Sequence, residues 1–293
     1  MDAQHYKGRF AAGIGAGMML AKTLIIVFGL QLISYASRGE GEAHRCRFKI
    51  VGMALAMALG PIMEVASYAF APQSLLAPIN GFDLVWNVIL APLLLGEKTN
   101  RAKIVGTFIV FMGSCIAPIS GPHAVTAFSL EDLRENFLST RFLLYATVCM
   151  LGCLIGLDIL RRRKQLRHHV PGKDVVRGTL IGVGGGFLAG QSYFMSASAT
   201  LLHACMEDGT WGAWLDWLPY ATVGGAIGCA LLNAVLLNMG LAEFEATFFV
   251  PMFAGSAISA SCISASVVLR ETIDLPYWRM ACYWFGVLLI VVG

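Results

Sequence analysis

Charged side chains are scarce in this sequence. They make up 13% of the 293 residues, whereas soluble domains carry about 25%. The net charge of +3 is too small to suggest nucleic acid as a partner. Hydrophobic residues, in contrast, make up 57% of the chain, and the mean hydropathy is +0.69. This composition predicts an all-α integral membrane protein, built as a single polytopic membrane domain over residues 1–293.

Several kinds of site lack the residues that they need. The cysteines lie mostly inside apolar runs, and only Cys149 and Cys153 are close, so we expect neither a disulfide framework nor a zinc site. The glycine runs 13–17 and 182–186 lack the Lys-Ser/Thr that follows in a phosphate-binding loop, and we expect them to pack helices. No paired nucleophile and base, and no His, falls at mid-membrane depth. We therefore expect neither an enzyme nor a resident cofactor.

Nine apolar runs are long enough to cross a bilayer as helices of about 17–25 residues. They are 11–35, 48–70, 73–95, 103–119, 142–160, 176–202, 217–239, 243–269 and 276–293. Minimal connections at Ala71–Pro72 and around Gly240 predict antiparallel helical hairpins. Between the fourth and fifth runs, Ser129 and Asp132 begin a stretch with helical spacing of apolar and charged residues. That stretch predicts a short interfacial helix.

The positions of Lys and Arg predict the orientation. Most of them lie in the loops after the odd-numbered spans, for example at 45–49, 98–103 and 161–167. Because cytoplasmic loops carry the excess of basic residues, the N-terminus is expected outside or in a lumen and the C-terminus in the cytoplasm. We interpret the basic block 161–167 as a topology anchor. The sequence does not predict which membrane holds the protein.

A weak internal repeat relates the two halves of the chain. The matched segments are Gly13–Lys22 with Gly182–Gln191, Pro78 with Pro251, and Gly106 and Gly113 with Gly286 and Gly293. Repeat one covers residues 11–119 (spans 1–4), and repeat two covers residues 176–293 (spans 6–9). The span at 142–160 links the two repeats. A single linking span inverts the second copy. Inverted repeats of this kind are typical of secondary transporters, which bind substrate near the midplane between the repeats.

Ionisable residues inside membrane spans are costly and mark pathways or ion pairs. Three lie at mid-depth here, namely Lys22, Glu64 and Asp83. The hairpin at Ala71–Pro72 places Glu64 and Asp83 roughly 10–18 Å below the same surface, so both carboxylates can face one cavity. Lys22 lies at a similar depth, and its match in the second repeat, Gln191, is also polar.

Two interpretations of these residues stay open. In the first, an oxygen-rich ion site is formed by Glu64, Asp83, Asn80, Asn87, Gln191, Asn233 and Asn238, with Glu64 and Asp83 as metal ligands. In the second, Lys22 pairs with one carboxylate and the amides hold helices together. Such a pair lowers the charge of the cavity to about −1, which suits a polar organic cation, a zwitterion or a proton-coupled solute better than a divalent ion.

Two prolines fall at matched positions inside apolar spans. Pro78 and Pro251 each remove a backbone donor and favour a kink. We expect these kinks to act as hinges or gates between the repeats, with plain packing kinks as the alternative.

The stretch from Ser67 to Pro118 resembles one family closely. Its motifs are Tyr-Ala-Phe-Ala-Pro at 68–72, Leu-Ala-Pro at 76–78, Leu-Leu-Leu-Gly-Glu-Lys at 93–98, and Gly106 with Gly113; Leu-Leu-Asn233, Val-Pro251 and Arg-Glu271 continue the likeness. This pattern resembles the NIPA-type magnesium transporters of the drug/metabolite transporter (DMT, EamA-like) superfamily. The resemblance implies Mg²⁺ as substrate, nine spans and an N-terminus outside.

Three departures from that pattern affect the substrate. Where the family has Gly-Glu with Asn three residues later, this chain has Gly60-Pro61 and then Glu64. Small residues of the family pattern are replaced by Asn80 and Asp83, and Lys22 in the first span is not expected from the family. The expected function is alternating-access transport of Mg²⁺ or another divalent cation around a midplane polar cavity. The alternative is a DMT-type carrier of a small polar organic solute such as a metabolite, an amine or a nucleotide-sugar-like molecule. The expected partners are the lipid bilayer and the transported species, not nucleic acid, and a homodimer stays open.

Overall fold

The computed structural model describes residues 2–38, 42–96, 100–123, 130–165, 175–209, 211–244, 246–273 and 275–293. These residues form helices joined by short turns, and none of them lies in a strand. The chain folds into two units, each of which is described by itself. The first unit comprises Met1–Val125 and Leu275–Gly293, and the second comprises Thr126–Asp274.

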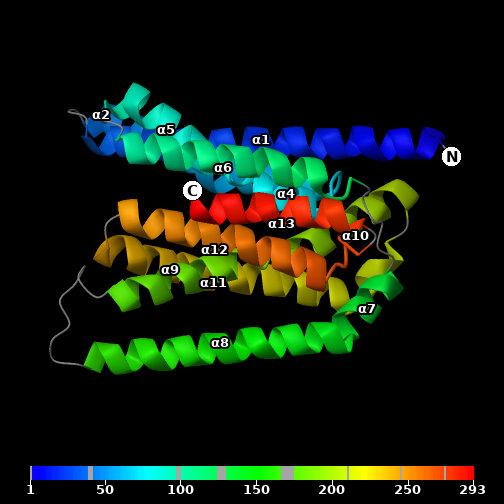
Figure 1. Ribbon diagram of the computed structural model, residues 1–293. Coiled ribbons are helices and arrows are strands. Elements are labelled where there is room, and N and C mark those ends of the chain that lie inside the picture. Colours follow the sequence, from blue (N-terminus) through cyan, green and yellow to red (C-terminus); the bar gives the residue numbers. More distant parts are fainter. Residues whose placement is uncertain are drawn as a thin grey trace. The chain divides into compact units, whose positions relative to one another are not determined.

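The first unit is built around one long N-terminal helix. Its helices are α1 (Asp2–Arg38), α2 (Glu42–Ala54), the π-helical turn η1 (Leu55–Leu59), α3 (Gly60–Tyr68), α4 (Gln73–Ile79), α5 (Phe82–Leu95), α6 (Arg101–Ser120) and α13 (Tyr277–Val292). Helix α1 packs against α2, α3 and α5, while the C-terminal helix α13 lies along α6 (Figure 1). The wider turn η1 directly precedes Pro61, whose missing N–H disrupts regular α-helical bonding there.

The second unit surrounds helix α9. Its helices are α7 (Leu130–Leu138), α8 (Thr140–Gln165), α9 (Val175–Ala189), α10 (Tyr193–Asp208), the 3₁₀ turn η2 (Gly212–Leu215), α11 (Leu218–Glu243) and α12 (Ala246–Val267). Helix α9 packs against both α11 and α12. The short helix predicted after Ser129 is confirmed as α7, although Ser129 itself lies outside the described residues. Leu133 and Phe137 of α7 are buried in the hydrophobic core of the unit.

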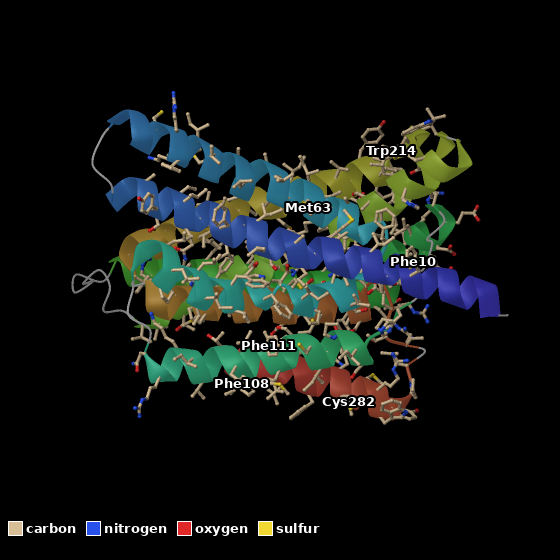
Figure 2. All side chains as sticks on the ribbon, turned by 90° about the horizontal axis from the view of Figure 1, so that it is seen from above. Phe10, Met63, Phe108, Phe111, Trp214 and Cys282 are labelled. Carbon is tan, nitrogen blue, oxygen red and sulfur yellow. The ribbon has the colours of Figure 1, made fainter. Side chains whose placement is uncertain are left out.

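Six of the described helical segments are long and apolar enough to cross a membrane. They are Phe10–Ala36, Gln73–Leu94, Arg101–Ser120, Thr140–Arg162, Leu218–Gly240 and Phe249–Val267. Large apolar side chains are exposed on these helices, among them Phe10 of α1 and Phe108 of α6 (Figure 2). Outward apolar side chains at this density need lipid rather than water around them. The chain is thus a multi-pass, all-α integral membrane protein.

Small residues let helices approach closely in both units. A Cβ on Gly113 of α6 would lie 2.5 Å from the carbonyl oxygen of Gly286 in α13, and one on Gly29 of α1 would lie 2.8 Å from that of Gly52 in α2. In the second unit, a Cβ on Gly186 of α9 would lie 2.2 Å from the carbonyl oxygen of Phe253 in α12. The prediction that the glycine run 182–186 packs helices is therefore confirmed.

Three details of the predicted spans differ from the structure. The turn predicted around Gly240 was placed too early, because α11 continues to Glu243. Gly240 stays helical and receives the ring of Phe249, which a Cβ there would approach to 2.1 Å. The predicted runs 73–95 and 176–202 are each interrupted, at Asn80–Gly81 and at Gly190–Ser192.

Local bonding explains both interruptions. The backbone N–H of Asn80 donates to the carbonyl oxygen of Ala77 at 3.2 Å, and that of Gly81 donates to the carbonyl oxygen of Pro78 at 3.0 Å. These bonds to the third residue back tighten the turn after Pro78. In the second unit, the Gln191 side chain donates to the carbonyl oxygen of Phe187 at 2.9 Å and competes with the backbone ladder. Periodicity of apolar residues does not report such side-chain competition.

Candidate ion-binding site

A charged cluster lies inside the first unit, where α1, α3 and the α4–α5 junction meet. The Lys22 ammonium of α1 lies 3.2 Å from Glu64 Oε2 of α3 and donates to Asn80 Oδ1 at 2.9 Å. Lys22 is only 5% exposed, and the Glu64 side chain is 20% exposed. The structure therefore brings together Lys22 and Glu64, which the sequence places at similar depth, and the ion pair of the second interpretation is formed with Glu64.

Asp83 completes this cluster from the first turn of α5. Its charge interacts with those of Lys22 and Glu64, so the three ionisable groups share one site. Asp83 Oδ1 is buried and accepts no hydrogen bond from the residues that the structure describes. A buried carboxylate oxygen without a donor is costly, and it is a natural ligand for a cation.

The backbone around Asn80 explains how the cluster is assembled. Every residue of α4, from Gln73 to Ile79, is buried, which fixes the segment that leads to Asn80. The tight turn at Asn80–Gly81 then separates α4 from α5. A Cβ on Gly81 would lie 2.2 Å from Ser114 Oγ of α6 and 3.2 Å from the carbonyl oxygen of Pro78, so this turn packs closely against α6.

A second set of polar contacts continues along the seam between α1 and α5. Gln31 Nε2 donates to Asn87 Oδ1 at 2.6 Å, and Trp86 Nε1 donates to Thr23 Oγ1 at 3.1 Å. Gln31 is 6% exposed, whereas Asn87 is exposed. Sequence reasoning had selected Asn87 and missed Gln31, Thr23 and Trp86. Gln31 could have been found, because it is an amide inside the first apolar run.

The remaining predicted site residues lie in the second unit. Gln191 is buried, accepts a hydrogen bond from the Tyr145 hydroxyl at 2.8 Å, and thereby joins α8 to the turn between α9 and α10. Asn233 is partly buried, and its Oδ1 has no hydrogen-bond partner among the described residues. Asn238 is exposed on α11, and Pro251 is exposed on α12, in contrast to the buried Pro78. The contacts of Gln191 are those expected of an amide that holds helices together.

The ligand types in the first unit favour a hard, hydrated cation. Two carboxylates and amide oxygens are available, and Mg²⁺ binds oxygen ligands while keeping several of its waters. Among the described residues, no three or more His, Cys, Asp or Glu side chains are grouped closely enough to hold a metal ion directly. The donor set thus fits a cation held through few protein ligands and water, rather than a resident transition metal.

Besides the exposed Arg162–Asp158 pair within α8, two ion pairs of the second unit join different segments of the chain. Arg177 of α9 binds Glu243 of α11 through two hydrogen bonds of 2.7 and 2.8 Å, and Arg177 is 4% exposed. Arg134 of α7 binds Asp216, which also accepts the backbone N–H of Leu218 at the start of α11. That N–H and, next, the Arg134 guanidinium lower the pKa of Asp216. These pairs connect helix ends.

Comparison with known proteins agrees with the resemblance seen in the motifs. The chain is 22% identical to the probable magnesium transporter NIPA8 of Arabidopsis thaliana over 246 residues, which cover 82% of this chain and 55% of that protein. It is 22% identical to the probable magnesium transporter NIPA1 of the same plant over 245 residues, or 82% and 68% of the two chains. The human NIPA-like protein 2 is 22% identical over 273 residues, or 92% and 68%.

The chain therefore spans about half to two thirds of the length of these relatives. No solved structure matches it. The family model described as magnesium transporter NIPA matches residues 14–293, nearly the whole chain. The family is one of transporters and not of enzymes. On this evidence the chain belongs to the NIPA magnesium transporter family.

Proposed function

We propose that this chain transports Mg²⁺ across a membrane, with Glu64 and Asp83 as the ligands that attract the ion. The observation that carries the proposal is the cluster formed by the buried Lys22 with the partly buried Glu64, Asn80 and Asp83 inside an apolar helical unit. Buried charge in a membrane protein is costly and is retained where an ion or substrate passes. The names of the relatives, which are magnesium transporters, supply the identity of the ion.

The proposed mechanism is alternating access by two inverted repeats, spans 1–4 and 6–9 of nine. Matched packing supports it: α1 contacts α3 and α5 in the first unit, and α9 contacts α11 and α12 at equivalent positions in the second. The repeat-related helices α6 and α13 also pack on each other through Gly113 and Gly286. Pro78 and Pro251 are the proposed hinges, with the N-terminus outside and the C-terminus in the cytoplasm.

Mg²⁺ uptake into proteoliposomes tests the proposal. Glu64→Gln and Asp83→Asn each remove one negative charge with little change in shape, and each is expected to lower the initial uptake rate at least about tenfold. Asp158→Asn is the matched control, because Asp158 is 57% exposed on α8 and is paired only with Arg162 among the described residues. Uptake at the wild-type rate by both cluster variants would exclude these residues as the ion ligands.

One observation favours a second candidate function, the carrier of a small polar organic solute. The Lys22–Glu64 pair reduces the charge available to a divalent ion. If this candidate is correct, purified protein in liposomes takes up no Mg²⁺ above empty liposomes. Vesicles loaded with a mixture of amines or zwitterionic metabolites then show counterflow of a labelled member of that mixture.

A further inference from the structure

Lys22 has an unusual place in a protein that moves cations. Its ammonium group lies 3.2 Å from Glu64 Oε2, inside a unit where Lys22 is 5% exposed, and it interacts with Asp83 as well. A cation site normally excludes lysine, because like charges in a medium of low dielectric repel strongly. We propose that Lys22 is a tethered cation, which pairs with Glu64 until Mg²⁺ displaces it. This inference rests on the proposed function.

The charge of the site supports this role. With Lys22 in place, Lys22, Glu64 and Asp83 carry a formal charge of about −1, and a bound Mg²⁺ changes it to about +1. Without Lys22, the same site would change from about −2 to about 0 and would hold the ion far more tightly. A transporter must release its ion in every cycle, so a competing ammonium that speeds release is useful.

The contacts of Lys22 also provide a place for the displaced ammonium. Lys22 Nζ donates to Asn80 Oδ1 at 2.9 Å, and this acceptor is neutral. When Mg²⁺ binds Glu64, the Lys22 ammonium loses its contact with the carboxylate and donates to water instead, while it keeps its hydrogen bond to Asn80 Oδ1. The long, flexible side chain of lysine permits this movement without a shift of α1.

A purely structural ion pair does not explain the second carboxylate. Glu64 and the Asn80 amide already satisfy Lys22, yet the partly buried Asp83 belongs to the same cluster, and its buried Oδ1 accepts no hydrogen bond from the described residues. A single Lys–Glu pair would be stable without that additional buried charge. The excess carboxylate is explained if the site alternates between the ammonium and a divalent ion.

Kinetics in proteoliposomes test the proposal. Lys22→Met and Lys22→Gln remove the tethered charge, and Lys22→Gln keeps an N–H donor for Asn80 and Glu64 should Lys22→Met fail to fold. Both are expected to lower the KM for Mg²⁺ uptake at least about tenfold. Lys22→Arg keeps the charge and is expected to stay within about threefold of the wild-type KM. Arg162→Gln controls for loss of a positive charge from an exposed pair and should leave KM unchanged.

Binding without transport gives an independent measurement. The rise in melting temperature that a fixed Mg²⁺ concentration gives detergent-solubilised protein should be larger in the Lys22→Gln variant than in the wild type, in parallel with its lower KM. If Lys22→Gln folds, its KM does not fall and its Mg²⁺-induced rise in melting temperature is no larger, the tethered-cation proposal is wrong and Lys22 is only a structural partner. Loss of uptake in Glu64→Gln and Asp83→Asn would still support Mg²⁺ transport in that case, so the two proposals fail separately.

Discussion

Helix α9 offers two neighbouring glycines whose replacement should have opposite effects. A Cβ on Gly186 would lie 2.2 Å from the carbonyl oxygen of Phe253 and 2.0 Å from Ser256 Oγ, both in α12. The Ser256 hydroxyl can rotate away, but the carbonyl belongs to the helix backbone, so α9 and α12 must separate. A Cβ on Gly184 would meet only Leu236 Cδ1, at 3.8 Å, which is ordinary contact.

The expected magnitudes follow from these distances. Alanine in place of glycine inside a helix is favourable by about 1 kcal/mol, and this gain applies to Gly184→Ala and Gly186→Ala alike. Overpacking against a rigid neighbour costs about 1–3 kcal/mol, and it applies to Gly186→Ala alone. The two variants should therefore differ by about 1–3 kcal/mol, with Gly184→Ala equal to or more stable than the wild type.

Thermal unfolding of the purified protein in detergent measures this difference. We expect a melting temperature below the wild type for Gly186→Ala and one at or above the wild type for Gly184→Ala. Equal melting temperatures for the two variants would refute the close packing of α9 on α12. Since Gly186 belongs to the glycine run that the repeat matches to residues 13–17, the result also tests why this run contains glycine.

Two further predictions concern the ion pairs of the second unit. Arg177→Met leaves Glu243 without its bidentate partner and should lower the stability of the protein in detergent by about 3 kcal/mol. Arg162→Met breaks an exposed pair and should change the stability by about 0–1 kcal/mol. Equal effects of the two variants in urea or thermal unfolding would contradict the burial of Arg177. The lowered pKa of Asp216 means that its ionised form stabilises the folded state fully above the ordinary value of 3.8, and this contribution is lost as the pH falls through the lower folded pKa. The fall in melting temperature below about pH 4 should thus be shallower in Asp216→Asn than in the wild type, and parallel curves would show that Asp216 contributes nothing.

The fold was predictable from the sequence where the length of apolar runs and local turn or helix signals decide it. Long apolar runs with few charges can only be helices in lipid, because each helix satisfies its own backbone hydrogen bonds. The turn at Ala71–Pro72 and the short helix α7 are present in the structure, because proline and a helical spacing of apolar and charged residues are local signals. The turn near Gly240 was misplaced, because glycine there accommodates the ring of Phe249 rather than a change of direction.

Of the candidate site, the sequence predicted only the residues whose charge is energetically costly inside a membrane span. These residues, Lys22, Glu64 and Asp83, are recognisable because a charge inside an apolar span is costly and marks a pathway or an ion pair. Gln31 and Tyr145 were missed, since an amide or a phenol in such a run is tolerated and gives a weaker signal. Gln191, Asn233 and Asn238 lie in the second unit, and their part in an ion site stays a proposal.

The sequence by itself determined that the chain is an all-α membrane protein of the NIPA family, because composition, apolar run length and the motifs around Ser67–Pro118 are local properties. Only the tertiary structure decided which charges meet. Lys22 could have paired with either carboxylate or with neither, and it bonds Glu64 and Asn80 because α3 and the tight turn after Pro78 place those oxygens beside α1. The pairing of residues far apart in the chain depends on helix rotation and close approach at glycines, which no local pattern encodes.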